Sequence, residues 1–204
     1  MGMRVAMDFA RMGWRVGVAA RRLDRLQEIK AQFPDRVEAM AIDVAAPDAA
    51  RRFESLIELI DGMDVFLYAA GTGWRNPSLD PAVEARTIDV NVRGFTAIVT
   101  SACRYFARTA NRTPGQIAVI TSVAGARGLG ISPAYSASKR YQWNYLDAID
   151  QLAHASRINV DITDIRPGFV DTALLADDPR KDSLPMLMSI DYVAPLIEKA
   201  VLRR

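Results

Sequence analysis

The sequence has 204 residues, of which 50% are hydrophobic and 25% are charged, and its formal net charge at pH 7 is +2. This composition excludes a disordered or fibrous chain and is typical of a globular protein with a substantial core. Basic and acidic residues are interspersed, which argues against nucleic acid as a partner. The only histidine and cysteine are His154 and Cys103, which cannot form a zinc site or an internal disulfide, so we expect no metal.

The chain contains no apolar run near the roughly 20 residues that are needed to span a bilayer. Its N-terminus carries neither the apolar core of a signal peptide nor a basic leader. We therefore expect a soluble, cytoplasmic protein that does not bind membranes.

Helical and strand-like patterns alternate along the first half of the sequence. Val5, Phe9 and Met12 recur at helical spacing as far as Gly13. We then expect, in chain order, a strand at 14–20, a helix at 23–33, a strand at 37–42, an amphipathic helix after Pro47 and a buried strand at 65–69.

The second half continues this alternation. A long helical pattern at 81–109 leads to a strand at 116–121 and a loop with three glycines. A helix at 135–155 precedes a strand that begins near Ile158 and stops at Arg166-Pro-Gly168. Such alternation predicts an α/β, Rossmann-like fold: a doubly wound parallel sheet in the middle of three α/β/α layers. We expect residues 1–204 to form one dinucleotide-binding and catalytic domain.

Small or polar residues follow four of the predicted strands. They are Asp43, the pair Ala70-Gly71, Ser122 and the pair Pro167-Gly168. In a parallel sheet, ligands bind at the carboxyl ends of the strands, where the strand order reverses. These residues are therefore expected to line one crevice.

A Y-x-x-x-K pentad runs from Tyr135 to Lys139, and Ser122 ends the strand-like run 13 positions upstream. On a helix, residues four positions apart lie on the same face, one turn apart. An ammonium beside a phenol favours the phenolate, so we expect Lys139 to lower the Tyr135 pKa from its usual value of about 10. The tyrosine can then exchange protons with an alcohol or a ketone, while the Ser122 hydroxyl holds the carbonyl.

Each of these residues also has a purely structural explanation. A lone Y-x-x-x-K is common by chance and forms an exposed helical pair, and Ser122 has the position of a turn residue at a strand end. Asn91 is equally suited to bind backbone groups inside a helix. Asp43 is equally suited to cap the loop before Pro47. Catalysis is favoured by the combination of motifs and not by any one of them.

Together, the motifs resemble the classical short-chain dehydrogenase/reductase (SDR) family over nearly the whole chain. The matching segments are Ser122, Tyr135-x-x-x-Lys139, Asn91 within Asp89-Val-Asn-Val, Asp43-Val44 and Pro167-Gly-Phe-Val-Asp-Thr172. The resemblance implies that Tyr135 is the general acid/base, and that Lys139 lowers its pKa and holds the nicotinamide ribose. It also implies that Ser122 positions the substrate oxygen and that Asn91 supports a proton-relay water near Lys139.

The resemblance also implies a nicotinamide cofactor along the strand ends. Besides Tyr135 and Lys139, three groups of residues are expected to contact the cofactor. Asp43 and Val44 would flank the adenine, and Ala70 and Gly71 are small enough to admit the cofactor. The carboxamide would be contacted by Pro167, Gly168, Val170 and Thr172. In the family, an acidic residue after the second strand selects NAD, whereas an arginine accommodates the 2′-phosphate of NADP. Arg21 and Arg22 stand there with no carboxylate before them, so we expect NADP(H). The alternative is that they only begin a helix, with Asp24 as a local partner.

The N-terminus departs from the family pattern. The family opens with a strand and a T-G-x-x-x-G-x-G turn that binds the pyrophosphate, and Met1-Gly2 matches only its last two positions. Gly2 is therefore the one cofactor contact expected from this turn. The missing first strand would lie in the middle of the sheet, and its loss leaves two edges unpaired. We expect that the native chain begins upstream and that its C-terminus is also short.

We expect an NADP(H)-dependent oxidoreductase that acts on a small secondary alcohol or ketone. Residues 174–189 occupy the position of the family's substrate lid, and Trp74, Asn76 and Leu129 would form the opposite wall. The family also implies a homodimer or homotetramer built on the helix that carries Tyr141 and Tyr145. The alternative is a non-catalytic nucleotide-binding or interaction protein of the same fold.

Overall fold

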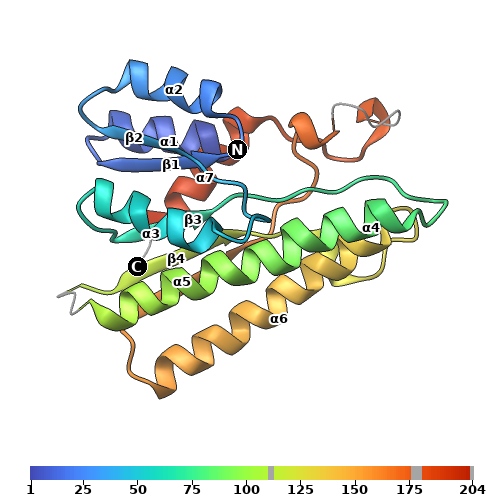
Figure 1. Ribbon diagram of the computed structural model, residues 1–204. Coiled ribbons are helices and arrows are strands. Elements are labelled where there is room, and N and C mark those ends of the chain that lie inside the picture. The colour runs from blue at the N-terminus through green and yellow to red at the C-terminus, as the bar shows by residue number, and fades with distance from the viewer. Residues whose placement is uncertain (110–112, 176–180, 203–204) are drawn as a thin grey trace.

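The computed structural model describes residues 1–109, 113–175 and 181–202 (Figure 1). The elements of its first half are α1 (Gly2–Arg11), β1 (Val16–Ala20), α2 (Leu23–Gln32), β2 (Val37–Ala41), α3 (Ala49–Leu59) and β3 (Val65–Tyr68). All six occur in the predicted order. Hydrophobic spacing alone was therefore enough to place them.

The second half contains α4 (Pro81–Ile88), α5 (Phe95–Arg108), β4 (Gly115–Ile120), α6 (Pro133–Ala155), β5 (Val160–Ile165) and α7 (Ile190–Leu202). The helix predicted at 81–109 is interrupted by a π-helical turn at Asp89–Gly94. The C-terminal helix α7 was not predicted. No helix within the described ranges is both long and apolar enough to cross a membrane.

Prolines and a side-chain cap determine where the helices around the candidate site begin. Asp80 precedes α4 and accepts a hydrogen bond from the backbone nitrogen of Ala82 at 2.8 Å, with Pro81 between them. Pro133 occupies the first turn of α6. Proline suits this position because its fixed backbone angle is helical and the first turn does not need its missing N–H.

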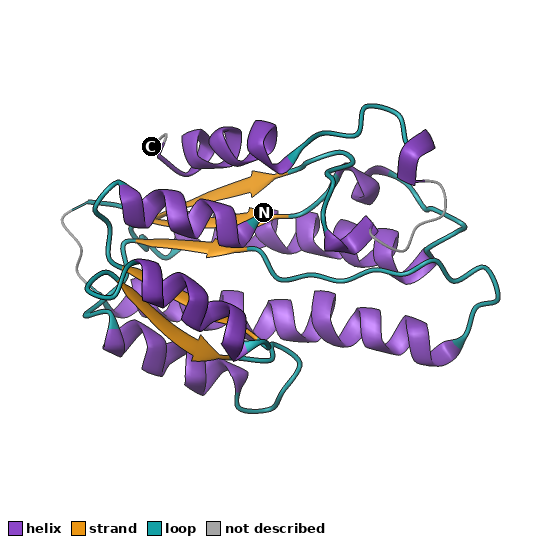
Figure 2. Ribbon diagram, turned by 90° about the horizontal axis from the view of Figure 1, so that it is seen from above, coloured by secondary structure: helices purple, strands orange, loops and turns teal. Residues whose placement is uncertain are grey.

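The strands form two parallel sheets. β1 pairs with β2, and β3, β4 and β5 pair in that order. β1 and β3 are not hydrogen-bonded to each other, and no described strand lies between them. The strand that the family resemblance places there is therefore absent from the described residues. Figure 2 shows both groups of strands running in the same direction.

Helices cover both faces of these strands (Figures 1 and 2). On one face, α1 and α7 pack against β4 in an apolar cluster that includes Val5, Phe9, Val193 and Ile197, while α2 covers β1 and β2. On the other face, α3, α5 and α6 enclose the largest cluster. Every residue of β4 is buried, so this strand is the centre of the three-stranded group. The result is the predicted arrangement of parallel strands between two helical layers.

Tyr68, at the end of β3, replaces the asparagine that the family commonly has at this position. Its ring is 3% exposed and lies against Phe95 on α5, with ring centroids 5.4 Å apart. Its hydroxyl has no hydrogen-bond partner among the described residues, and burial raises its pKa. Aromatic packing therefore takes the place of polar contacts at the end of β3.

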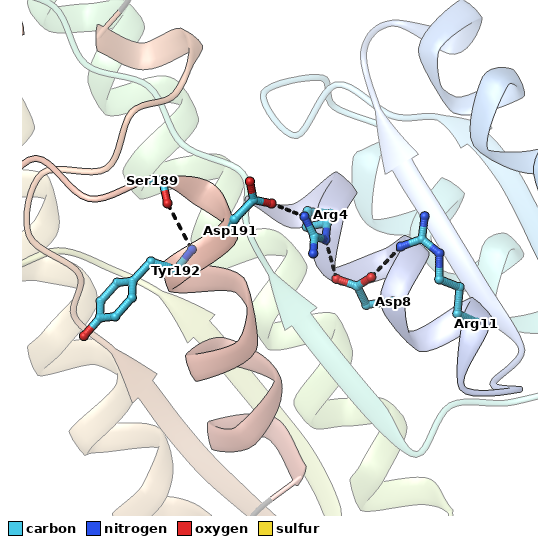
Figure 3. A network of polar contacts seen from close by, with 6 residues as sticks. All are labelled: Arg4, Asp8, Arg11, Ser189, Asp191 and Tyr192. Atoms are coloured by element: carbon cyan, nitrogen blue, oxygen red, sulfur yellow. Dashed lines mark hydrogen bonds and ion pairs between the residues drawn. The ribbon is translucent and has the colours of Figure 1, made fainter.

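An ionic network joins the outer sides of α1 and α7 (Figure 3). Arg4 binds Asp8 one turn along α1 at 2.7 Å and also binds Asp191 at the start of α7. Arg11 contacts the second oxygen of Asp8 at 2.5 Å. Burial, followed by a hydrogen bond with Asp8, raises the pKa of Glu198 on α7. The network links the first and last helices, which are distant in sequence.

Candidate active site

Ser122 lies two residues after β4, at the carboxyl end of the central strand. Its side chain is nearly buried, and its Oγ accepts a hydrogen bond from the backbone nitrogen of Ala124 at 3.1 Å. That bond caps a short 3₁₀ helix at Val123–Ala126. The backbone nitrogen of Val123 donates to the carbonyl of Pro167 at 3.1 Å, which ties the ends of β4 and β5 together. The predicted turn role of Ser122 is therefore present, and its hydroxyl lies close enough to Tyr135 to influence the pKa of the phenol.

Tyr135 and Lys139 lie on the same face of α6, as the pentad predicted. The Lys139 Nζ is 5.9 Å from the centroid of the Tyr135 ring. The ring also lies against the backbone of Gly73, where a Cβ atom would stand 2.4 Å from the ring Cδ2. Only glycine fits at position 73, so this loop and α6 together hold the phenol.

The predicted effect of Lys139 on the phenol is wrong for this chain. Burial raises the Tyr135 pKa, and the hydrogen bond with Ser122 only partly opposes this. Lys139 is itself 4% exposed, and burial lowers its pKa to about 8 although the charge of Asp164 opposes the change. The ammonium lies over the phenol ring and donates to other groups, so loss of water governs both residues.

Gln142 is the main partner of Lys139, and the sequence analysis missed it. The Lys139 Nζ donates to Oε1 of Gln142 at 3.0 Å and, over a longer distance of 3.4 Å, to the carbonyl of Ile120. Gln142 stands three positions after Lys139 on α6. Such residues face each other on a helix, so this spacing was the signal that could have found it.

Asn91 lies in the π-helical turn and is completely buried. Its Oδ1 accepts from the backbone nitrogen of Thr72 at 2.9 Å, and its Nδ2 donates to the Thr72 carbonyl at 2.7 Å and to Ser138 Oγ at 3.0 Å. The Asn91 side chain therefore holds the loop after β3. This is the structural role that the sequence analysis gave as the alternative, in which Asn91 binds backbone groups. Its connection to Lys139 runs from its main-chain carbonyl through Gln142.

The residues expected at the adenine end lie after β1 and β2. Arg21 and Arg22 are exposed and make no hydrogen bond or ion pair with the rest of the described chain. The Oδ1 of Asp43 accepts from the backbone nitrogen of Ala45 at 3.0 Å, so the predicted capping role is present. Val44 lies against Gly94, where a Cβ atom would be 2.6 Å from the Val44 carbonyl oxygen.

Two glycines lie at the end of β3. A Cβ atom on Gly71, which follows Ala70, would be 3.5 Å from Lys139 Nζ, so this backbone passes close to the ammonium. A Cβ atom on Gly2 would be 2.9 Å from the Cβ of Ala69. The first turn of α1 thus begins at the same edge as the catalytic candidates.

The segment after β5 returns to this edge. Gly168 approaches Met188, and the buried Val170 forms a β-bridge with the same residue. Thr172 Oγ1 accepts a long hydrogen bond, 3.4 Å, from the backbone nitrogen of Leu174. Of the expected lid, 176–180 lies outside the described residues.

Several of the residues expected at the wall and at the interface make hydrogen bonds within the chain. Asn76 is 2% exposed and its Nδ2 binds Glu84 Oε1 at 2.8 Å, so it does not line an open wall. The hydroxyls of Tyr141 and Tyr145 bind Thr96 and Thr100 of α5 at 2.8 and 2.9 Å. These two tyrosines therefore join α6 to α5 within one chain.

Comparison with known proteins agrees with this arrangement. The family model described as short chain dehydrogenase matches residues 1–183. An uncharacterized oxidoreductase of Myxococcus xanthus is 31% identical, covering 100% of this chain and 80% of that protein. Hydroxysteroid 11-beta-dehydrogenase 1-like protein B of Xenopus laevis is 26% identical, covering 84% and 60%. A short-chain type dehydrogenase/reductase from Mycobacterium marinum has a similar crystal structure, with a TM-score of 0.85 at 21% identity over 98% of this chain and 83% of that one.

The chain belongs to the short-chain dehydrogenase/reductase family, and it is an oxidoreductase with the α/β, Rossmann-like fold of that family. The predicted family and fold are therefore confirmed. The family implies a nicotinamide cofactor, and the residues present fit one. The Lys139 ammonium has three donors, of which the described residues accept two, and the adjoining Gly71 has no side chain to fill the space.

Proposed function

We propose that the protein is an NADP(H)-dependent oxidoreductase that interconverts a secondary alcohol and a ketone. The observation that carries the proposal is the convergence of Ser122, Tyr135 and Lys139 at the carboxyl end of β4. Ser122 comes from the end of β4, and Tyr135 and Lys139 come from α6, the next α-helix along the chain. A proton donor, a hydroxyl that can hold a carbonyl oxygen and a buried cation are the groups that carbonyl reduction needs.

When bound, the nicotinamide supplies or accepts the hydride. In the reducing direction, Tyr135 donates its phenolic proton to the carbonyl oxygen while Ser122 holds that oxygen by a hydrogen bond. The raised Tyr135 pKa suits this step, because the phenol keeps its proton at neutral pH. Lys139, whose ammonium lies over the phenol ring, would offer its third donor to the cofactor.

NADP is supported as the cofactor by Arg21 and Arg22, which stand at the exposed end of β1 without a described partner. A guanidinium binds phosphate by paired, charge-assisted hydrogen bonds. The substrate class is supported by the name of the Xenopus laevis relative, which is that of a hydroxysteroid dehydrogenase. Assembly as a homodimer or homotetramer is part of the same proposal, by analogy with the family.

Replacing Tyr135 by phenylalanine tests the mechanism. Loss of the general acid is expected to reduce NADPH-dependent turnover of a panel of ketones by about 100- to 10,000-fold. NADPH binding, measured by fluorescence, should persist. Tyr145→Phe is the matched control, because the hydroxyl that it removes binds Thr100 outside the site. Equal turnover in Tyr135→Phe and the parent protein would remove the phenol from the mechanism.

A non-catalytic nucleotide-binding protein is the second candidate. It is favoured by the structural hydrogen bonds that Ser122, Asn91 and Asp43 make within the fold. An NADPH titration of the 204-residue chain separates the two. Saturable binding with no turnover of any carbonyl compound would favour the second candidate, whereas absence of binding would contradict both.

A further inference from the structure

Gln142 connects two parts of the candidate site that are far apart in sequence. It is completely buried on α6. Its Oε1 accepts from Lys139 Nζ at 3.0 Å, and its Nε2 donates to the main-chain carbonyl of Asn91 at 2.9 Å. One carboxamide thus contacts the ammonium with its acceptor and the π-helical turn with its donor.

The π-helical turn explains why the Asn91 carbonyl is available. In an α-helix this oxygen would accept from the backbone nitrogen four residues later, which belongs to Phe95. Here the Phe95 nitrogen donates to the carbonyls of Val90 and Val92 instead. The Asn91 oxygen therefore does not receive its α-helical donor, and Gln142 Nε2 donates to it from a neighbouring helix. A hydrogen bond to a buried carbonyl stabilises the turn that carries it.

The charged and titratable groups around Lys139 are Asp164 on β5 and Tyr135 on its own helix. Asp164 acts at longer range, because its oxygens bind Thr121 Oγ1 at 2.5 Å and Arg166 Nε at 2.6 Å. The Ile120 carbonyl is a neutral and more distant acceptor. Gln142 is therefore the acceptor that contributes most to the position of the ammonium.

We propose that Gln142 is a positioning residue, whose carboxamide holds the Lys139 ammonium beside Tyr135 by bridging it to the Asn91 carbonyl of the π-helical turn. The functional part of this inference rests on the proposed role of Lys139. The bridge itself is a property of the chain. Gln142 and the Ile120 carbonyl accept from two of the three donors of the Lys139 ammonium. The third donor remains for a ligand.

Two variants separate positioning from simple packing. Gln142→Leu keeps an apolar side chain of similar size but removes the acceptor, so the ammonium is less stable and the Lys139 pKa falls. Gln142→Glu places a carboxylate beside the ammonium and raises that pKa by roughly one unit or more, as an opposite charge at contact does. A loss of packing alone would not shift the pKa in opposite directions.

The measurement is an NMR pH titration of isotope-labelled lysine in the complete chain. Lys30, Lys139, Lys181 and Lys199 are the only lysines, so few signals occur, and Lys139→Met identifies the one of interest. Burial sets the starting value, since it lowers the Lys139 pKa to about 8. The titration requires neither cofactor nor substrate.

Gln116→Leu is the matched control. Gln116 lies at the opposite end of β4, is 1% exposed, and binds Thr163 Oγ1 at 2.9 Å. The same substitution at this buried glutamine should leave the Lys139 titration unchanged. The remaining lysine signals report whether each variant is folded.

Opposite shifts of the Lys139 titration in the two Gln142 variants would support the proposal. An unchanged titration in both, or a shift in the same direction in both, would overturn it. If the shifts occur but the parent protein binds no NADPH, the bridge stands and the proposed function fails. If the parent protein reduces a ketone with NADPH and the titration does not move, the function stands and the bridge fails.

Discussion

The two groups of strands differ in how completely the protein encloses them. In the three-stranded group, all of β4 is buried, and Ser122 lies two residues beyond its end. In the two-stranded group, Val16 and Gly17 of β1 are half-buried and its last two residues are exposed. Both groups are parallel and both carry candidate residues at their carboxyl ends. Only the three-stranded group has a strand that is buried along its whole length.

This difference corresponds to the chemistry proposed for each group. Proton transfer needs side chains that are fixed and shielded from water, because electrostatic effects are stronger where the dielectric is low. Tyr135 and Lys139 meet that condition, and burial shifts the pKa of both. Phosphate recognition by Arg21 needs an accessible cation and no enclosed layer. Burial therefore distinguishes the part of this edge that is proposed for catalysis from the part that is proposed to select the cofactor.

The largest expected effect concerns the buried cation of the three-stranded group. Because burial lowers the Lys139 pKa in the folded state to about 8, the unfolded chain binds more protons between that pH and the ordinary lysine value. Stability contributed by this group should therefore rise with pH across that interval, by about 3 kcal/mol in total. Below pH 8, the buried charge of Lys139 lowers the free energy of unfolding.

Urea unfolding at pH 7 and pH 10 measures this effect in the parent protein and in Lys139→Met. The parent should gain stability relative to the variant as the pH rises. Lys199→Met is the control, since Lys199 is exposed on α7 and its substitution should not change the pH dependence. A constant difference between the parent and Lys139→Met would show that the ammonium is not desolvated.

A second prediction compares glycines in the two groups. A Cβ atom on Gly115 in β4 would be 2.2 Å from Cε1 of the buried Phe106 ring, whereas one on Gly17 in β1 would be 3.0 Å from Cγ of Leu56. Gly115→Ala should therefore reduce the free energy of unfolding by roughly 1–3 kcal/mol. Gly17→Ala should reduce it less. Chemical denaturation of both variants checks the order, and the reverse order would break the comparison between the groups.

The smallest expected effect concerns the exposed end of β1. Arg21→Ala should weaken NADPH binding about tenfold, which corresponds to roughly 1.4 kcal/mol, and leave NADH binding and stability unchanged. Arg25→Ala is the control, because Arg25 is also an exposed arginine but lies within α2. Equal losses for NADPH and NADH would contradict a contact with the 2′-phosphate.

The sequence alone was sufficient to predict the alternation of strands and helices and to find the Tyr135–Lys139 pair. Hydrophobic spacing is a local property, and Tyr135 and Lys139 are related by one helical turn, so both could be predicted without knowing any distant contact. Helix α7 was not predicted from the sequence. The Arg4–Asp191 contact shows the reason, since this helix is tied to α1 at the opposite end of the chain.

Tertiary structure alone decided the electrostatics of the site and the partners of its residues. Whether Lys139 lowers the phenol pKa depends on how much water each group loses, and burial is set by contacts between distant elements. The π-helical turn, the Gly73 contact with Tyr135 and the Gln142 bridge arise in the same way. Spacing along the chain thus determined which groups are available, and packing across the chain decided what they bind and how readily they ionise.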